Sequence, residues 1–170
     1  MAEFHSGEIK DVLVRELRRF DDRRGWLTEL FRHDELAAEF FPAMAYISST
    51  RPGVARGPHE HVDQADLFCF IGPSNFKLRM WDNRSDSPTF RNVMTIVVGA
   101  DNPAAVVVPK GVVHAYQNVG GADGIVINCP NRLYMASSGA NQLTRFDTKT
   151  IRKRSFGWTI SESSSHHRSS

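Results

Sequence analysis

Two short segments of the sequence concentrate side chains that can exchange protons or bind a metal. His59 and His61 are one residue apart, and in a strand residues i and i+2 face the same side of the sheet. Further along the chain, His114 and Tyr116 repeat this spacing and share their face with Val112. The apolar company of Val112 favours an inward face. The sequence therefore predicts that three imidazoles and a phenol converge in one cavity.

Such a cluster supports two kinds of chemistry. A neutral imidazole, with a pKa of about 6.5, accepts a proton at physiological pH, and a nearby cation would stabilise the negative charge that results. Alternatively, the three histidines with Asp66 or Gln64 offer ligands that suit divalent iron, manganese or zinc. Two expectations stay open: a site without a cofactor, or a divalent metal held by His59, His61, Asp66 and His114.

The elements that must position these side chains are short strands. Turn residues recur roughly every 8 to 15 positions, and the runs between them are rich in Val, Ile, Phe, Trp and Tyr, which is typical of an all-β sandwich or barrel. One short helix is expected over residues 35–40, with Asp34 as its N-cap and Pro42 just beyond its end. Strands are expected over residues 45–49, 67–71, 76–81, 93–98, 104–108, 112–117 and 124–129.

Length and composition bound the class of protein. A chain of 170 residues, 41% hydrophobic and 24% charged, is expected to form one domain over residues 1–160, followed by a disordered Ser-rich tail over residues 161–170. No apolar run approaches the roughly 20 residues that span a bilayer, so we expect a cytoplasmic protein that does not bind membranes. A net charge of +2 without a broad basic surface argues against nucleic-acid binding. Cys69 and Cys129 lie in apolar runs and are expected to be buried, unpaired thiols.

Two motifs resemble those of the cupins, whose fold is a double-stranded β-helix, or jelly-roll barrel. The second cupin motif, P-x-G-x-x-H-x-x-x-N, is matched at residues 109–118. The first, H-x-H followed by an acid and a glycine, is approximated by His59, His61, Asp66 and Gly72, with Asp in place of the usual Glu. Together and in this order, the motifs imply the cupin barrel.

A closer resemblance extends to about residue 147, to the nucleotide-sugar epimerases typified by dTDP-4-dehydrorhamnose 3,5-epimerase. It is carried by DRRGWLTELF at residues 22–31, GVARGPH at residues 53–59 and DNRSDSPTF at residues 82–90. The resemblance implies a homodimer that needs no metal and acts on a 4-keto-6-deoxy nucleotide sugar. It also implies residue roles: His59 is the base beside the ketone, Arg56 is the nearest cation, His114 and Tyr116 contact the substrate, and Arg24 and Glu29 bind the nucleotide, partly across the dimer interface.

The chain departs from this family at several functional positions. The family's catalytic tyrosine, thirteen residues after His114, falls on Ile127, and its lysine has only Asp66 nearby. The family's Gln and Asn before the first motif align with Met44 and Tyr46, and its late aspartate falls near residue 164.

A second likeness concerns residues 56–61, which read RGPHEH and resemble the R-G-x-H-x-H of nucleotide-sugar 3,4-ketoisomerases. That likeness gives His61 a catalytic role beside His59. Three functions therefore remain in competition: a keto-sugar epimerase or isomerase, a non-catalytic cupin that binds a nucleotide sugar, and a metal-dependent cupin enzyme.

Overall fold

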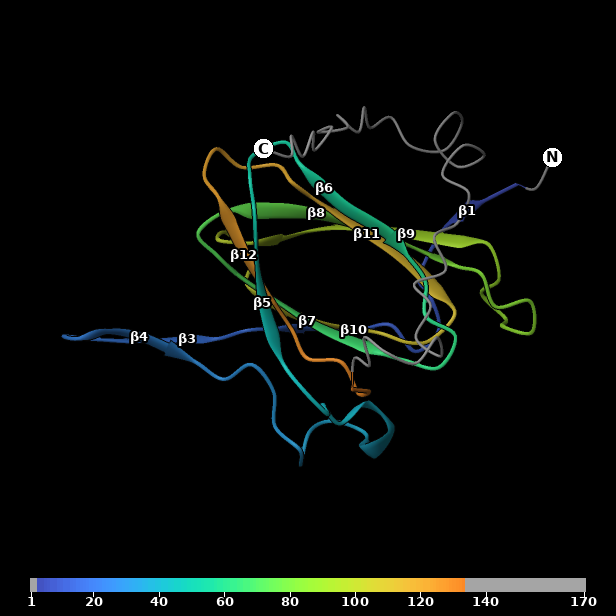
Figure 1. The fold of residues 1–170 in the computed structure, drawn as a ribbon, viewed down its shortest axis with the longest axis horizontal. Helices are drawn as coiled ribbons and strands as arrows, with labels where there is room; N and C mark the ends of the chain where they lie inside the picture. Colours follow the sequence, from blue (N-terminus) through green and yellow to red (C-terminus); the bar gives the residue numbers. More distant parts are fainter. Residues whose placement is uncertain (1–2, 134–170) are drawn as a thin grey trace, which may run out of the picture.

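The computed structural model describes residues 3–133, which fold into two facing β-sheets and a projecting hairpin (Figure 1). The elements are β1 (His5–Ser6), β2 (Leu13–Glu16), β3 (Arg19–Asp22), β4 (Gly25–Thr28), a 3-10 helix η1 (Ala38–Phe40), β5 (Tyr46–Thr50), β6 (Ala55–His59), β7 (Asp66–Gly72), β8 (Asn75–Asp82), β9 (Asn92–Gly99), β10 (Ala104–Val108), β11 (Val112–Asn118) and β12 (Gly124–Asn128).

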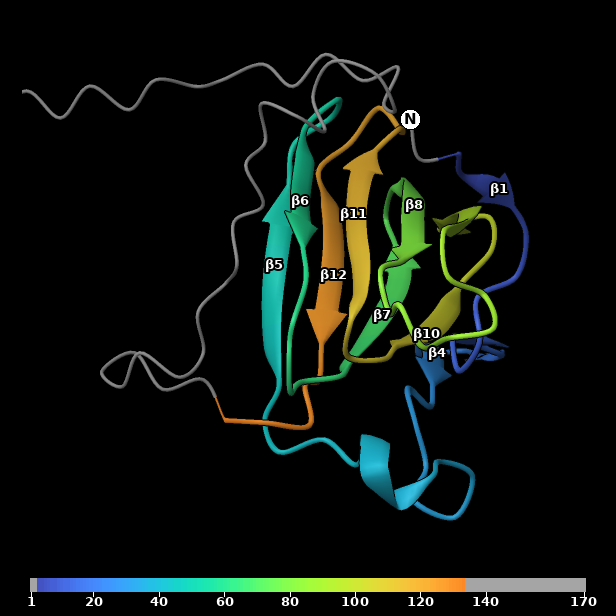
Figure 2. The ribbon, with the colours of Figure 1, turned by 90° about the vertical axis from the view of Figure 1, so that its right-hand side faces the viewer.

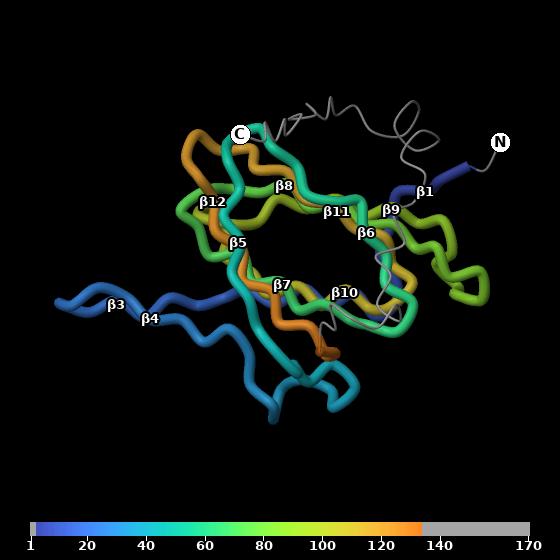
Figure 3. The backbone as a smooth tube through the Cα atoms, in the orientation of Figure 1, coloured from blue at the N-terminus to red at the C-terminus, as the bar shows by residue number. Residues whose placement is uncertain are grey.

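The strand order is that of a jelly roll. One sheet runs β1-β9-β8-β11-β6 and the other β2-β10-β7-β12-β5, and every pair within them is antiparallel except β1 with β9. Figures 2 and 3 show the two sheets stacked face to face. The expected all-β, cupin-type barrel is therefore confirmed.

The core explains why the central strands are so apolar. One cluster fills the space between the sheets and includes Phe70, Phe76 and Val106, none of which is exposed. A second cluster covers the outer face of β7 and β10 and packs beneath the segment from Leu30 to Phe40. Because β7 and β10 are covered on both faces, their sequences are nearly continuous apolar runs rather than alternating ones. Cys69 and Cys129 belong to the outer cluster as buried free thiols, as expected.

The seven expected strands are all present, with ends shifted by no more than a residue or two. The expected helix is wrong: only η1 forms, as a single 3-10 turn, and no side chain caps it. Asp34 cannot serve as the cap because its carboxylate is bound to the guanidinium of Arg32, at 2.7 and 3.0 Å. Leu36 and Phe40 instead face the outer cluster, which fixes this segment by packing. The predicted Ser-rich tail lies outside the described residues.

The hairpin β3–β4 projects away from the barrel as a separate two-stranded sheet (Figure 1). Its largest apolar side chains, Phe20, Trp26 and Leu27, are 49%, 47% and 62% exposed. The sequence did not predict this hairpin from strand patterns. Nothing helical within residues 3–133 has the length and apolar character needed to cross a lipid bilayer.

Candidate active site

An irregularity in β6 brings its functional side chains to one face. His59 lies opposite His114 and Arg56 lies opposite Tyr116, with a register shift between the two pairs. Directly opposed residues share a face, so this bulge lets Arg56 and His59 both point inward although they are three positions apart. Gly57 makes this possible: its φ is +97°, and a Cβ there would stand 2.7 Å from the His114 carbonyl oxygen.

The three histidines lie together inside the barrel. The His114 ring centroid is 6.1 Å from that of His59 and 5.8 Å from that of His61. The Phe68 ring meets His114 edge-on at 5.2 Å and forms the apolar wall beside it. His114 is only 3% exposed, whereas the other two imidazoles are partly accessible. The cluster is therefore open to a small molecule on the β6 side.

A buried carboxylate joins two of these imidazoles. Asp66 is 2% exposed, and its Oδ2 lies 3.1 Å from His61 Nε2 and 3.5 Å from His114 Nε2. Its Oδ1 accepts hydrogen bonds of 2.9 Å from the side-chain amides of Gln64 and Asn128. Burial alone would raise the pKa of the Asp66 carboxyl, but its hydrogen bonds, first that from His61 and then that from Asn128, help to outweigh burial and hold the pKa below its usual value. Asp66 is therefore ionised.

Burial acts in the opposite sense on His114. Desolvation lowers the pKa of the His114 imidazole to about 4, although the Asp66 charge works against the shift. His114 is thus neutral at physiological pH. Its Nδ1 lies 3.3 Å from the Val112 carbonyl oxygen, a contact that requires the proton on Nδ1.

A chain of polar groups on the opposite sheet completes the site, and the sequence motifs did not predict it. The Asn128 amide nitrogen donates to Asp66 and, at 2.8 Å, to the Tyr46 hydroxyl oxygen. Asn128 follows Val126 on the inward face of β12, so the alternation of β12 could have revealed it. Ile127 faces the outer cluster instead. The position reached by counting from His114 is therefore not in the cavity at all.

Arg56 and Tyr116 tie the two sheets together beside the histidines. The Arg56 guanidinium donates to Thr50 Oγ1 at 2.8 Å and to the Ser49 carbonyl at 2.6 Å. Tyr116 places its hydroxyl 3.3 Å from Ser48 Oγ, and burial raises the pKa of this phenol. Its ring packs against three phenylalanines, Phe68, Phe70 and Phe76. Tyr116 therefore forms the apolar floor of the cavity, with its polar tip turned to β5.

The structure does not bring Arg24 and Glu29 to the histidines of the same chain. Arg24 lies on the hairpin, 82% exposed, with its guanidinium on Asp22 at 2.6 Å. Glu29 follows the hairpin and lies 3.6 Å from Arg32. Within the described residues, the ion pairs of Arg24 and Glu29 are to neighbours in the sequence and not to the histidine site.

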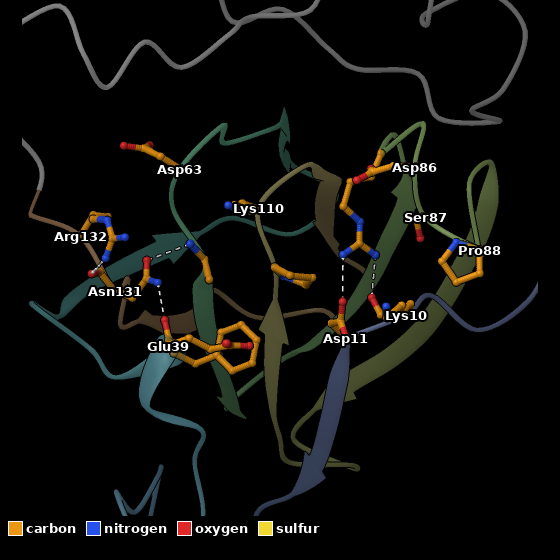
Figure 4. A pocket seen from close by; sticks show the side chains of 14 residues that line it. Lys10, Asp11, Glu39, Asp63, Asp86, Ser87, Pro88, Lys110, Asn131 and Arg132 are labelled. Carbon is orange, nitrogen blue, oxygen red and sulfur yellow. Dashed lines mark hydrogen bonds and ion pairs between the residues drawn. The ribbon is translucent and has the colours of Figure 1, made fainter.

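A separate pocket of about 410 Å³ opens between the β6–β7 loop and the turns at residues 84–88 and 109–110 (Figure 4). Lys10, Lys110 and Arg132 line it together with Asp63 and Asp86, so its charge is mixed. Its wall, as described, includes none of the three histidines. This pocket is therefore distinct from the histidine cluster.

Known proteins resemble this chain over most of its length. The sequence profile of the dTDP-4-dehydrorhamnose 3,5-epimerases matches residues 6–163. The chain belongs to this family. It is 36% identical over 127 residues to a probable low-salt glycan biosynthesis epimerase of Haloferax volcanii, covering 74% of this chain and 81% of that protein. A spore coat polysaccharide biosynthesis protein of Bacillus subtilis is 31% identical over 150 residues, covering 88% and 96%.

Solved structures of the family share the fold. A dTDP sugar isomerase from Desulfovibrio desulfuricans aligns with a TM-score of 0.75 at 20% identity, over 91% of this chain and 94% of that one. A dTDP-4-dehydrorhamnose 3,5-epimerase from Bacillus anthracis, solved with TDP and PPi bound, aligns with a TM-score of 0.71 at 22% identity, over 94% and 91%. The family is thus one of dTDP-sugar epimerases of carbohydrate biosynthesis, and this chain is epimerase-like in sequence and fold.

Proposed function

We propose that the protein epimerises or isomerises a 4-keto-6-deoxy sugar linked to dTDP, with His59 as the base that removes a proton beside the ketone. The observation that carries the proposal is the inward placement of Arg56 and His59 opposite Tyr116 and His114, in a chain of this family. A ketone acidifies the neighbouring C–H bond, and a positioned imidazole contributes roughly 10²- to 10⁴-fold to such a proton transfer. Arg56 supplies positive charge for the enolate.

The carboxylate of Asp66 does not oppose this chemistry. A bare anion would repel an enolate, but both oxygens of Asp66 are already engaged, Oδ2 by the His61 imidazole and Oδ1 by two amides. Its charge instead orients His61, in the way a buried carboxylate orients the imidazole of a catalytic dyad. His61 is therefore the second proton-handling group if the reaction moves the ketone between adjacent carbons.

Deuterium exchange tests the proposal directly. The protein, incubated with the 4-keto-6-deoxy dTDP-sugar in heavy water, should label the carbon beside the ketone, as read by NMR. His59→Ala should lower the rate by at least about 10²-fold. His5→Ala, which removes an exposed imidazole on β1, is the matched control and should exchange at the parental rate. Tight dTDP-sugar binding with no exchange by the parent protein would favour the non-catalytic alternative.

Nucleotide binding is proposed to need two protomers. Arg24 and Glu29 lie outside the barrel cavity of their own chain, on and beside a hairpin with exposed Phe20, Trp26 and Leu27. A homodimer in which this hairpin packs on a second copy would bury the apolar side chains and bring Arg24 to the partner's site. We place this dimer in the cytoplasm, whose reducing conditions suit two buried free thiols.

Mixing two inactive variants tests this arrangement. In a mixed dimer of Arg24→Ala and His59→Ala, one of the two sites would combine an intact His59 with an intact Arg24. Random mixing of equal amounts should therefore restore up to about a quarter of the parental activity. Mixing Arg56→Ala with His59→Ala is the control, because both residues lie on β6 of the same chain and every site would lack one of them. Failure of the first mixture to exceed the second would contradict a shared site.

A metal-dependent activity is the second candidate, and the donor set fits it. His61 Nε2, Asp66 Oδ2 and His114 Nε2 lie within 4.8 Å of one another, a two-histidine, one-carboxylate set that suits a divalent ion. With its proton on Nδ1, His114 turns the lone pair of Nε2 toward Asp66, and a cation between these atoms would satisfy both. A bound ion would polarise the ketone.

Elemental analysis separates the two candidates. A metal enzyme should be purified with about one divalent ion per chain, should lose it in His61→Ala, and should stop exchanging deuterium after chelation. Exchange that persists at full rate in metal-free protein supports the metal-independent reaction.

A further inference from the structure

The hydroxyl of Tyr46 is held in the cavity by a buried amide. Tyr46 and Ser48 alternate on the same face of β5, and Ser48 Oγ lies 3.3 Å from the Tyr116 hydroxyl, so this face looks into the barrel toward β11. The Tyr46 hydroxyl oxygen accepts a 2.8 Å hydrogen bond from Asn128 Nδ2. Although the whole residue is 48% exposed, its polar end is therefore fixed at the site.

The hydrogen-bond pattern of Asn128 sets the direction of the Tyr46 proton. Asn128 Nδ2 has two protons, and it donates one to the ionised Asp66 and the other to Tyr46. The reverse orientation of the amide would set its oxygen against the Asp66 carboxylate. Because the Tyr46 oxygen acts as the acceptor, its own O–H points elsewhere, and no other described residue receives it. The Tyr46 hydroxyl can therefore donate its proton to a group other than Asn128.

A second polar atom in the same place also lacks a partner. Asn128 is 3% exposed, and its Oδ1 is buried with no hydrogen bond from any residue in the described range 3–133. Leaving a buried polar atom unpaired is unfavourable, so native proteins rarely do so without a function. The unpaired acceptor and the Tyr46 O–H belong to two residues that bond to each other, so the polar groups beside Asp66 are not all satisfied by the described residues.

Tyr46 and His59 lie on strands of different sheets, an arrangement that suits inversion. To invert a carbon, a base must remove the proton on one face and an acid must supply it on the other. His59 lies on β6 of one sheet, and Tyr46 lies on β5 of the sheet opposite (Figure 3). Burial raises the pKa of the Tyr46 phenol, more than the bond from Asn128 lowers it, so the group keeps its proton at neutral pH.

We propose that Tyr46 is the acid that returns a proton to the sugar carbon, on the face opposite His59. This inference rests on the proposed function. His59 takes the proton, and the C–H electron pair forms the C=C bond of an enolate with its charge on the former ketone oxygen. The C=C bond then takes the proton from Tyr46 and the C=O bond re-forms. Tyr46 is left as a phenolate, stabilised by the Asn128 N–H, and exchange with water restores both groups.

The test is Tyr46→Phe, assayed in heavy water for two quantities at once. With the base intact and the acid removed, His59 can return a deuteron only to its own face. Tyr46→Phe should therefore still label the carbon, at a rate within about tenfold of the parent, while inverted product falls by at least about 10²-fold. Ring-proton couplings in the NMR spectrum distinguish inverted from retained product.

The control variant and the possible results separate the role of Tyr46 from the proposed function itself. Thr95→Val removes a hydroxyl from the exposed face of β9, away from the site, and should leave both exchange and inversion unchanged. Inversion by Tyr46→Phe at the parental rate would overturn the acid assignment and leave the proposed function standing. So would a folded Tyr46→Phe, with parental melting temperature, that loses exchange and inversion together. A parent protein that neither exchanges nor inverts would instead refute the proposed function.

Discussion

Two buried carboxylates, Asp82 and Asp66, show how similar residues serve different ends in this barrel. Asp82, at the end of β8, is 1% exposed and accepts bonds from the Arg84 guanidinium at 2.8 and 3.0 Å and from the hydroxyls of Ser87 and Thr89, both at 2.6 Å. All these donors lie within seven residues. Burial would raise the pKa of Asp82, but these donors outweigh it and lower the pKa to about 2.

Asp66 is equally buried but differently connected. Gln64 and His61 are local partners, but His114 and Asn128 come from strands far along the sequence, and two of the four partners, His61 and His114, are imidazoles. Its amide partner Asn128 carries an unpaired oxygen. Asp82, whose oxygens are saturated by local donors, stabilises a turn. Asp66, which contacts two imidazoles and lies beside an unpaired acceptor, belongs to the candidate active site. The DNRSDSPTF segment is therefore explained by the fold, since its conspicuous residues bind one another.

The largest effect on activity is expected from Asp66→Asn. The amide keeps the volume and one acceptor for Gln64, but it loses the charge that orients His61 and compensates an imidazolium. The rate of deuterium exchange should fall by about 10³-fold. Thermal unfolding should change less than in Asp82→Asn, because no permanently charged group loses its partner. Parental exchange by Asp66→Asn would erase the distinction between the two carboxylates.

The converse substitution, Asp82→Asn, should affect stability and spare activity. Arg84 would lose its main counter-charge, and the free energy of unfolding should fall by about 3 kcal/mol. Denaturant titration measures the loss. Exchange per folded molecule should match that of the parent, because Asp82 makes no described contact with the histidines. A strong loss of deuterium exchange in folded Asp82→Asn would show that Asp82 and its partners also contribute to the reaction.

The sequence predicted the barrel and most of the histidine site for identifiable reasons. Strict alternation along β11 placed His114 and Tyr116 on the face of Val112, and all three are buried. The same logic could not foresee the bulge in β6, which depends on the left-handed backbone of Gly57. Nor could spacing alone show that Arg24 would lie on a projecting hairpin, because β3 and β4 have no buried face to impose a pattern.

The family's catalytic tyrosine falls on Ile127 in this chain, and this position shows that counting residues along the sequence does not identify which side chains enter the site. Position 127 was compared because it lies thirteen residues after His114, but a shift of one residue along a strand turns a side chain to the other face. Ile127 faces the outer cluster, and its neighbour Asn128 faces the site. Tyr46 is eighty-two positions away and meets Asn128 only because β5 pairs with β12. Contacts between distant strands require the folded structure.

A smaller effect is expected in the pH dependence of stability that Asp82 contributes. The folded-state pKa of Asp82 is lowered to about 2, below the value of about 3.9 in an unfolded chain. Its stabilisation is therefore complete above about pH 4 and is lost as the pH falls toward about 2, a change of roughly 2 kcal/mol. Asp82→Asn lacks the ionisable carboxyl, so this contribution to the loss of unfolding free energy at low pH should be absent from the variant. The difference in unfolding free energy between the parent and the variant, measured from about pH 5 to about pH 2, should therefore narrow.

The smallest effect is expected from Thr89→Val, which removes one neutral donor from Asp82 and keeps the side-chain shape. Four other bonds from Arg84 and Ser87 remain, so the carboxylate stays paired and the free energy of unfolding should fall by only about 1 kcal/mol. Thr95→Val, on the exposed face of β9, is the matched control and should change it by less than about 0.5 kcal/mol. A loss in Thr89→Val as large as that in Asp82→Asn would mean that the corner acts as a single unit, in which no one donor is replaceable.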